Sequence, residues 1–131
     1  MKRVLLDTNA YTHLLAGNDS VLDAISEADQ VYLSVFVMGE LLAGFRGGNK
    51  FVENRNILKI FIQKPTVALL NATEETADIF GQIKTELRQA GTPIPINDIW
   101  IAAHAIETGA VLISYDHHFS KIPGLRRWSS A

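Results

Sequence analysis

Residues 3–9, Arg-Val-Leu-Leu-Asp-Thr-Asn, set the pattern from which the fold of this chain is inferred. Three consecutive apolar residues suit a short strand that is buried on both faces, and a carboxylate, Asp7, follows at its carboxyl end. A second apolar run, at residues 111–115, also ends in an aspartate, Asp116. Because ligands bind outside the carboxyl ends of the strands in open α/β sheets, both aspartates are candidates for a functional site.

Away from these two runs, short apolar segments alternate with longer segments of helical period, which is the signature of βαβ units. We expect strands at residues 3–6, 31–34, 66–70 and 110–114, and a weaker one at residues 125–128. The predicted fold class is α/β, a three-layer α/β/α sandwich with a mainly parallel sheet of about five strands. No repeat or linker interrupts residues 1–131, so we expect a single domain.

Two helices have clear boundaries in the sequence. The first covers residues 74–90, with Thr73 as its N-cap and Gly91 at its end. Residues 92–96, Thr-Pro-Ile-Pro-Ile, must then be extended, because each proline restricts itself and its predecessor. We expect Asn97 to cap the next helix, which covers residues 98–108 and stops at a glycine.

The composition is that of an ordinary globular domain, with 47% hydrophobic and 20% charged residues. There is no cysteine, so a metal site would have to use oxygen or imidazole ligands. The apolar run before Asp7 is far too short for a signal peptide or a membrane span, and we expect a cytoplasmic protein without membrane contact. A net charge of -2 neither indicates nor excludes a nucleic-acid substrate.

Three aspartates each have a structural interpretation beside the functional one. Asp7 or Asn9 can cap a helix at residues 10–15, and Asp116 can simply form a turn. Asp98 can be an ordinary first-turn acid, although the residues after it, Ile-Trp-Ile-Ala-Ala, leave little room for exposure to solvent. Their combination with a fourth acid favours the functional interpretation.

That fourth acid, Glu40, is the only ionisable side chain in the otherwise apolar segment 35–45. A helix that is apolar all round is normally buried, and a buried ionised glutamate is costly unless it is paired or bound to a metal. The alternative is a long side chain that extends its carboxylate to solvent. We expect Glu40 to be buried and to join the three aspartates in one crevice at the carboxyl edge of the sheet.

Four neighbouring carboxylates require compensation by protons or cations. Two of them about 4 Å apart repel each other by roughly 4 kcal/mol at an effective dielectric constant of about 20. Oxygen ligands favour hard cations, so we expect Mg²⁺ or Mn²⁺, either of which can activate a water molecule. A histidine site is less favoured: we expect His104 in the core or at an interface, and one of His117 and His118 at the rim of the acid site.

Together, these motifs resemble the PIN-domain nucleases, and among them the small VapC-type toxins of toxin–antitoxin pairs. The matching segments appear in the family's order and span nearly the whole chain. They are residues 6–9 (Leu-Asp-Thr-Asn), Ser34 with Glu40, residues 97–103 (Asn-Asp-Ile-Trp-Ile-Ala-Ala) and residues 114–119 (Ser-Tyr-Asp-His-His-Phe). Ser114 stands where many relatives have threonine, a change that keeps the hydroxyl.

The resemblance implies an endoribonuclease whose catalytic and metal-binding residues are Asp7, Glu40, Asp98 and Asp116, with Mg²⁺ or Mn²⁺ as cofactor. The groups that would orient these ligands are Thr8, Asn9, Ser34, Asn97 and Ser114. The resemblance also implies a homodimer, and a hetero-oligomer with a VapB-like antitoxin that inserts a segment into the groove. A PIN-fold ribonuclease of RNA processing, unrelated to toxin–antitoxin pairs, is the main alternative.

Basic residues that follow Glu40 are the candidates for RNA contact. Those expected to hold the phosphate backbone are Arg46, Lys50, Arg55 and Lys59, although a solvated helix face has the same composition. A receiver-like phosphoacceptor module is a rival interpretation, but its first strand should end in paired acids, and here Asp7 is followed by Thr8. A haloacid-dehalogenase-type phosphatase needs an acid where Asn9 stands, and a noncatalytic PIN scaffold should lack one of the four acids.

Overall fold

A computed structural model of the chain describes residues 2–129. Its centre is a sheet of four parallel strands in the order β3-β2-β1-β4. The strands are β1 (Arg3–Leu6), β2 (Gln30–Ser34), β3 (Val67–Leu70) and β4 (Val111–Ile113). Their central side chains, such as Leu5, Leu33 and Leu112, are fully buried, as expected for strands covered on both faces.

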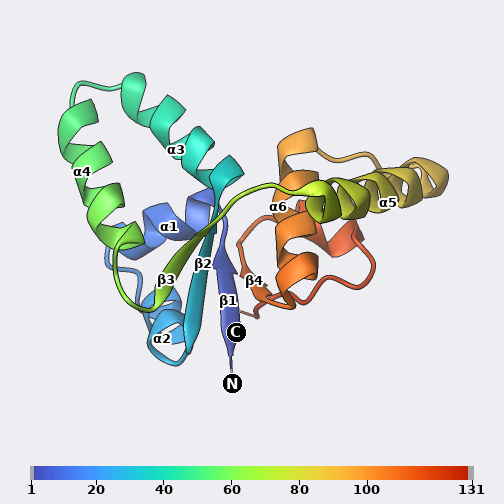
Figure 1. Cartoon of the computed structure of the whole chain (residues 1–131), viewed down its shortest axis with the longest axis horizontal. Coiled ribbons are helices and arrows are strands. Elements are labelled where there is room, and N and C mark those ends of the chain that lie inside the picture. The colour runs from blue at the N-terminus through green and yellow to red at the C-terminus, as the bar shows by residue number, and fades with distance from the viewer. Residues whose placement is uncertain (1, 130–131) are drawn as a thin grey trace.

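Helices cover both faces of this sheet. On one side lie α1 (Thr8–Leu15), α2 (Asp19–Ser26) and α4 (Phe51–Ile62), and on the other lie α5 (Glu74–Ala90) and α6 (Ile96–Thr108), as Figure 1 shows. At the carboxyl edge, α3 (Val35–Arg46) rises from β2 and forms a hairpin with α4. A short 3-10 helix, η1 (His117–Lys121), follows β4. The predicted three-layer α/β/α sandwich with a parallel sheet is confirmed.

The strand order places the carboxyl end of β1 at the topological switch point of the sheet. From β1 the chain moves to β2 and then β3, whereas β4 returns to the opposite side of β1. Crevices form at such switch points, because the connections leave the two neighbouring strands in opposite directions. The residues that follow β1 and β4 therefore flank the natural binding crevice of this sheet.

The predicted fifth strand at residues 125–128 is wrong within the described part of the chain. Only a single parallel bridge joins Arg127 to Leu112, with backbone hydrogen bonds of 2.9 Å on either side of it. β4 has only three residues, so its outer edge offers little room for a longer pairing.

The boundaries predicted for the helix at residues 74–90 are confirmed. Thr73 accepts a hydrogen bond from the backbone of Thr76, and Gly91 ends the helix with a left-handed φ of 69°. The predicted cap Asn97 is wrong, because α6 already begins at Ile96. Its capping position is Pro95, whose carbonyl accepts hydrogen bonds from the backbone N–H groups of the next turn. This helix start has no side-chain cap hydrogen bond, and the fixed φ of Pro95 is compatible with the N-cap position.

One buried polar group in the core lacks a partner among residues 2–129. Tyr11 of α1 is 1% exposed and packs edge-on against the ring of Phe61, with 5.4 Å between ring centroids. Its hydroxyl makes no hydrogen bond to any residue that the structure describes. Burial in this apolar environment raises the pKa of Tyr11 to about 12. The ring contributes to packing, whereas the hydroxyl contributes only a desolvation cost.

We therefore expect Tyr11→Phe to leave the free energy of unfolding unchanged or to raise it by about 1 kcal/mol, because removing an unpaired buried hydroxyl removes its desolvation penalty. Urea unfolding measures this difference. Tyr115→Phe is the control, since Tyr115 is partly exposed and its hydroxyl donates to Asn18. A clear loss of stability in Tyr11→Phe would show that the hydroxyl is paired in solution.

Candidate active site

Asp7 and Asp116 are held together by the serine that lies between β4 and η1. Ser114 Oγ donates to Asp7 Oδ2 at 2.5 Å and accepts from the backbone N–H of Asp116 at 2.9 Å. The register makes this contact possible, because Leu6 pairs with Ile113 and both chains leave the sheet at the same level. Asp7 is also the N-cap of α1 and is 5% exposed. The same side chain therefore caps a helix and lies beside Asp116.

Glu40 lies across the cavity on α3, and its expected burial is wrong. The residue is exposed, and only Val37 and Leu41 of α3 are buried. The helix projects beyond the sheet instead of running through the core, so its other apolar residues are only partly covered. The Glu40 carboxylate is nevertheless oriented, because Thr8 Oγ1 donates to Oε1 at 2.6 Å.

Asp98 lies in the first turn of α6 and lines the same cavity. It is half-buried, and its Oδ2 lies 3.2 Å from His118 Nδ1. The same nitrogen lies 3.1 Å from Asp116 Oδ1. One of the two adjacent histidines thus lies against the acids, as the sequence indicates, but its contact with both aspartates is not evident from spacing alone.

All four acids line one small cavity of about 150 Å³ at the carboxyl edge of the sheet. Its remaining lining residues are Thr8, Asn9 and Ile101. Since a water molecule in the liquid takes about 30 Å³, this space suits a cation with a few waters and not a large organic ligand.

The electrostatics of the cavity disfavour carboxylate charge when no cation is present. Burial raises the pKa of Asp7 above its ordinary value, and the charges of Asp116 and Asp98 raise it further, against the lowering effect of the Ser114 and Ala10 hydrogen bonds. Burial also raises the pKa of Asp98, with further contributions from Asp116 and Glu40 and an opposing one from His118. Both aspartates would be more readily ionised with a cation between them.

Of the five residues predicted to orient the acids, some contact the acids or the cavity and others do not. Thr8 and Ser114 bond to the acids, and Asn9 lines the cavity. Asn97 is half-buried and neither lines the cavity nor makes a side-chain hydrogen bond to a described residue. Ser34 is fully buried and acts on α3, where it accepts the Phe36 N–H as the N-cap.

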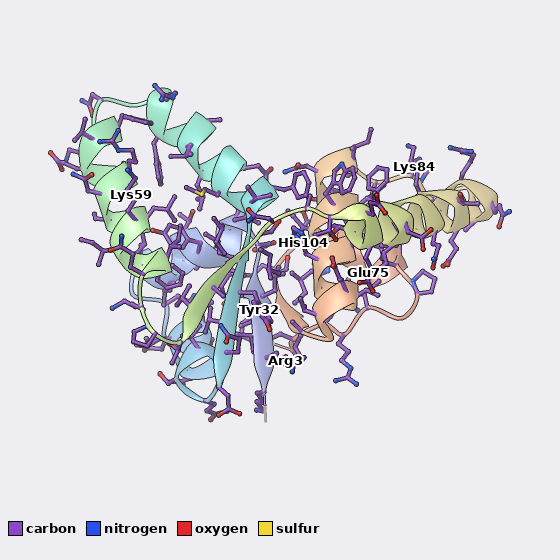
Figure 2. All side chains as sticks on the ribbon, in the orientation of Figure 1. Arg3, Tyr32, Lys59, Glu75, Lys84 and His104 are labelled. Carbon is purple, nitrogen blue, oxygen red and sulfur yellow. The ribbon has the colours of Figure 1, made fainter. Side chains whose placement is uncertain are left out.

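Ser34 also belongs to a buried network centred on His104, which is 1% exposed as expected for a core residue. The carbonyl of Asn71 can only accept, so His104 Nε2 donates to it at 3.2 Å. His104 Nδ1 then accepts from the Ser34 hydroxyl at 2.8 Å. Burial lowers the pKa of His104, which keeps the ring neutral. The ring thereby ties α6, which carries Asp98, to the start of α3 (Figure 2).

The basic residues predicted to contact RNA do not line the acid cavity. The guanidinium groups of Arg46 and Arg55 lie over the ring of Phe51, 4.1 and 5.5 Å from its centroid. Lys50 precedes α4, and Lys59 lies on α4, across the molecule from α5 (Figure 2). Arg46, Lys50 and Arg55 form a basic end of the α3–α4 hairpin, whereas Lys59 lies in the last turn of α4, away from that end.

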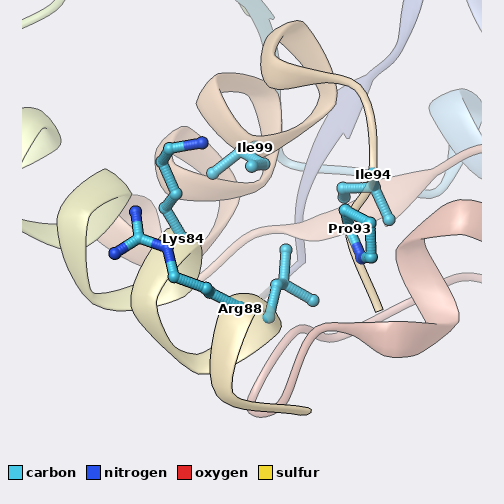
Figure 3. Close-up of a pocket in the computed structure, with 6 residues that line it drawn as sticks. Lys84, Arg88, Pro93, Ile94 and Ile99 are labelled. Carbon is cyan, nitrogen blue, oxygen red and sulfur yellow. The ribbon is translucent and has the colours of Figure 1, made fainter. Parts of the chain in front are cut away.

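A larger, mainly apolar cavity of about 300 Å³ lies apart from the acids, between α5 and the segment that leads into α6 (Figure 3). Its lining residues are Lys84, Leu87, Arg88, Pro93, Ile94 and Ile99. It contains no carboxylate, so the acid cavity is the better candidate for chemistry despite its smaller volume.

Comparison with known proteins supports this choice. The family model of the PIN domain matches residues 4–125. "Ribonuclease VapC2" of Haemophilus influenzae is 30% identical over 129 residues, which covers 96% of each chain. In the solved structure of VapBC-1 from nontypeable Haemophilus influenzae, the matching chain superposes with a TM-score of 0.87 at 26% identity, over 98% of both chains.

The solved structure of VapBC2 from Rickettsia felis, bound to a DNA fragment from its promoter, gives a TM-score of 0.84 at 28% identity and covers 96% of this chain and 97% of the other. The family expected from the sequence is confirmed. This chain belongs to the PIN-domain family, and its similarity to the VapC ribonucleases extends over almost its whole length.

Proposed function

We propose that this chain is a metal-dependent endoribonuclease and the toxin of a toxin–antitoxin pair. The observation that supports it most strongly is the cavity in which four acids from four separate elements converge in a PIN-domain chain. The relatives named VapC ribonuclease support RNA as the substrate, and the solved VapBC complexes support a VapB-like antitoxin as the partner.

The donor set of the cavity suits Mg²⁺ or Mn²⁺. It consists of four carboxylates with no sulfur ligand, and the raised pKa values of Asp7 and Asp98 indicate that negative charge there lacks compensation. A bound ion would lower the pKa of a coordinated water and neutralise charge on the phosphate. The chain itself holds the carboxylates in place, through Ser114 on Asp7 and Thr8 on Glu40.

RNA would run from the acid cavity along α3 toward the basic end of the hairpin. Glu40 and Arg46 are six residues apart on this helix, which corresponds to about 9 Å along its axis. That distance suits phosphate contacts one or two nucleotides from the cleaved bond. Arg46, Lys50, Arg55 and Lys59 remain the predicted backbone contacts.

Exposed apolar side chains on α4 support a protein partner. Val52, Ile57 and Ile60 are 57%, 45% and 62% exposed on one helix. We propose that antitoxin binding or homodimer formation covers these three side chains. No helix among residues 2–129 is long and apolar enough to cross a membrane. A cytoplasmic location, where RNA is available, is part of the proposed function.

The strand order disfavours the receiver-like alternative. Flavodoxin-like modules, to which receivers belong, have the order 2-1-3-4-5, whereas the order here is β3-β2-β1-β4. A ribonuclease of RNA processing has the same site chemistry and is distinguished by its effect on growth.

We expect purified protein to cleave RNA only when Mg²⁺ or Mn²⁺ is supplied. Asp7→Asn, Glu40→Gln, Asp98→Asn and Asp116→Asn should each reduce the cleavage rate by about a hundredfold or more, because each removes a charged ligand. Gel analysis of a labelled RNA measures the rate, with the exposed Asp23→Asn and Glu53→Gln as matched controls. Full activity in EDTA, or in all four variants, would refute the proposed chemistry.

The metal-free protein should be stabilised by Asp98→Asn near neutral pH. Burial raises the folded-state pKa of Asp98 above its ordinary value of 3.8, so the carboxyl stabilises the fold when protonated and loses this contribution as pH rises through the raised pKa. Thermal melts in EDTA should therefore show a higher melting temperature for the variant near neutral pH and no difference below about pH 4. Equal melting temperatures at both pH values would contradict a strained acid cluster.

Expression of the chain alone should arrest bacterial growth, because a toxin degrades RNA that the cell needs. Asp98→Asn, produced to the same level, should be harmless, and growth curves measure both. Normal growth with active enzyme in the cells would favour a role in RNA processing over a toxin.

A further inference from the structure

His118 is the one histidine side chain within contact distance of the acids among the described residues. Its backbone N–H donates to Asp116 Oδ1 at 2.9 Å, which fixes the first turn of η1. This turn directs the ring back toward α6, so Nδ1 lies 3.1 Å from Asp116 and 3.2 Å from Asp98. The imidazole thus lies at the point where the two elements approach each other.

The distances from His118 Nδ1 to the two carboxylate oxygens match those between neighbouring ligands of one ion. One atom each from Asp98, Asp116 and His118 lies within 4.8 Å of the other two. In an octahedral site with metal–ligand distances of about 2.1 to 2.2 Å, neighbouring donors lie about 3.0 to 3.1 Å apart. The separations of 3.1 and 3.2 Å from the nitrogen to the two oxygens are close to this value.

We propose that His118 Nδ1 is a direct ligand of the ion held by Asp98 and Asp116, and that this nitrogen makes the site prefer Mn²⁺ to Mg²⁺. This inference rests on the proposed function. Mg²⁺ is bound mainly by oxygen ligands, so a nitrogen ligand favours a transition-metal ion over Mg²⁺. Among the transition-metal ions, Mn²⁺ is the one that carboxylate oxygens also suit. An all-carboxylate site would not discriminate in this way, so His118 would determine which ion the enzyme uses.

The neighbouring histidine provides a matched control. His117 is also exposed on η1, but its side chain makes no hydrogen bond or ion pair with an acid among the described residues. Replacement of either histidine removes the same number of atoms from the same 3-10 helix. Only replacement of His118 should alter metal binding.

The first test uses the full-length protein, stripped of metal and titrated with Mn²⁺ or Mg²⁺ in a calorimeter. His118→Ala should raise the Kd for Mn²⁺ at least about tenfold and change the Kd for Mg²⁺ much less, whereas His117→Ala should change neither. His118→Asp, which supplies an oxygen donor, should bring the two Kd values closer together. Unchanged or tighter Mn²⁺ binding in His118→Ala would show that the ring is a hydrogen-bond partner that the ion displaces, which overturns the inference.

The second test observes the metal–nitrogen contact directly and begins with the wild-type protein. Pulsed EPR of the wild-type protein with Mn²⁺ should detect coupling to a histidine nitrogen, and this signal should be lost in His118→Ala and kept in His117→Ala. Bound Mn²⁺ without nitrogen coupling would overturn the inference and leave the proposed function intact. Failure of the wild type to bind either ion would instead refute the metal-dependent function itself.

Discussion

The pairing of β1 with β4 is the constraint on which the rest of the site depends. Leu6 faces Ile113 in this register, so the chain leaves both strands at one level and Ser114 can bridge Asp7 to the backbone of Asp116. A slip of one residue would turn the side chains at this edge to opposite faces and break the bridge. The buried strands thus do more than form a core: they determine where two of the four acids lie. α3 and α6 bring the other two acids to this point.

In the acid cavity, the charges that metal binding requires reduce the stability of the metal-free fold. Burial and neighbouring charge raise the pKa values of Asp7 and Asp98, so the ionised acids that a cation requires weaken the metal-free fold. The His104 network compensates in part by fixing the geometry, because a buried hydrogen bond to Ser34 joins α6 to the start of α3 and a partly buried one joins α6 to Asn71. The hydrogen bonds of Ser114 to Asp7 and of Thr8 to Glu40 orient two of the four acids directly.

Much of this arrangement could be predicted from the sequence, where local chemistry decides the outcome. Thr73 and Gly91 delimit α5 because capping depends on adjacent residues, and apolar runs identified the four strands. The cap of α6 was mispredicted because Pro95 starts the helix through its backbone, without the side-chain signal that Asn97 suggested. The burial of Glu40 was mispredicted because exposure depends on where a helix lies in the fold, which composition does not determine. The contact of His118 with Asp98 joins residues from separate elements, and no spacing rule predicts it.

We propose that the cavity between β1, β4, α3 and α6 holds a divalent cation. Anomalous X-ray diffraction from crystals grown with Mn²⁺ can test this, because the signal identifies the position of the ion independently of any activity. We expect an anomalous peak in the acid cavity, within bonding distance of carboxylate oxygens of Asp98 and Asp116. A crystal that shows well-ordered acids and no such peak, or a peak only elsewhere on the molecule, would contradict it.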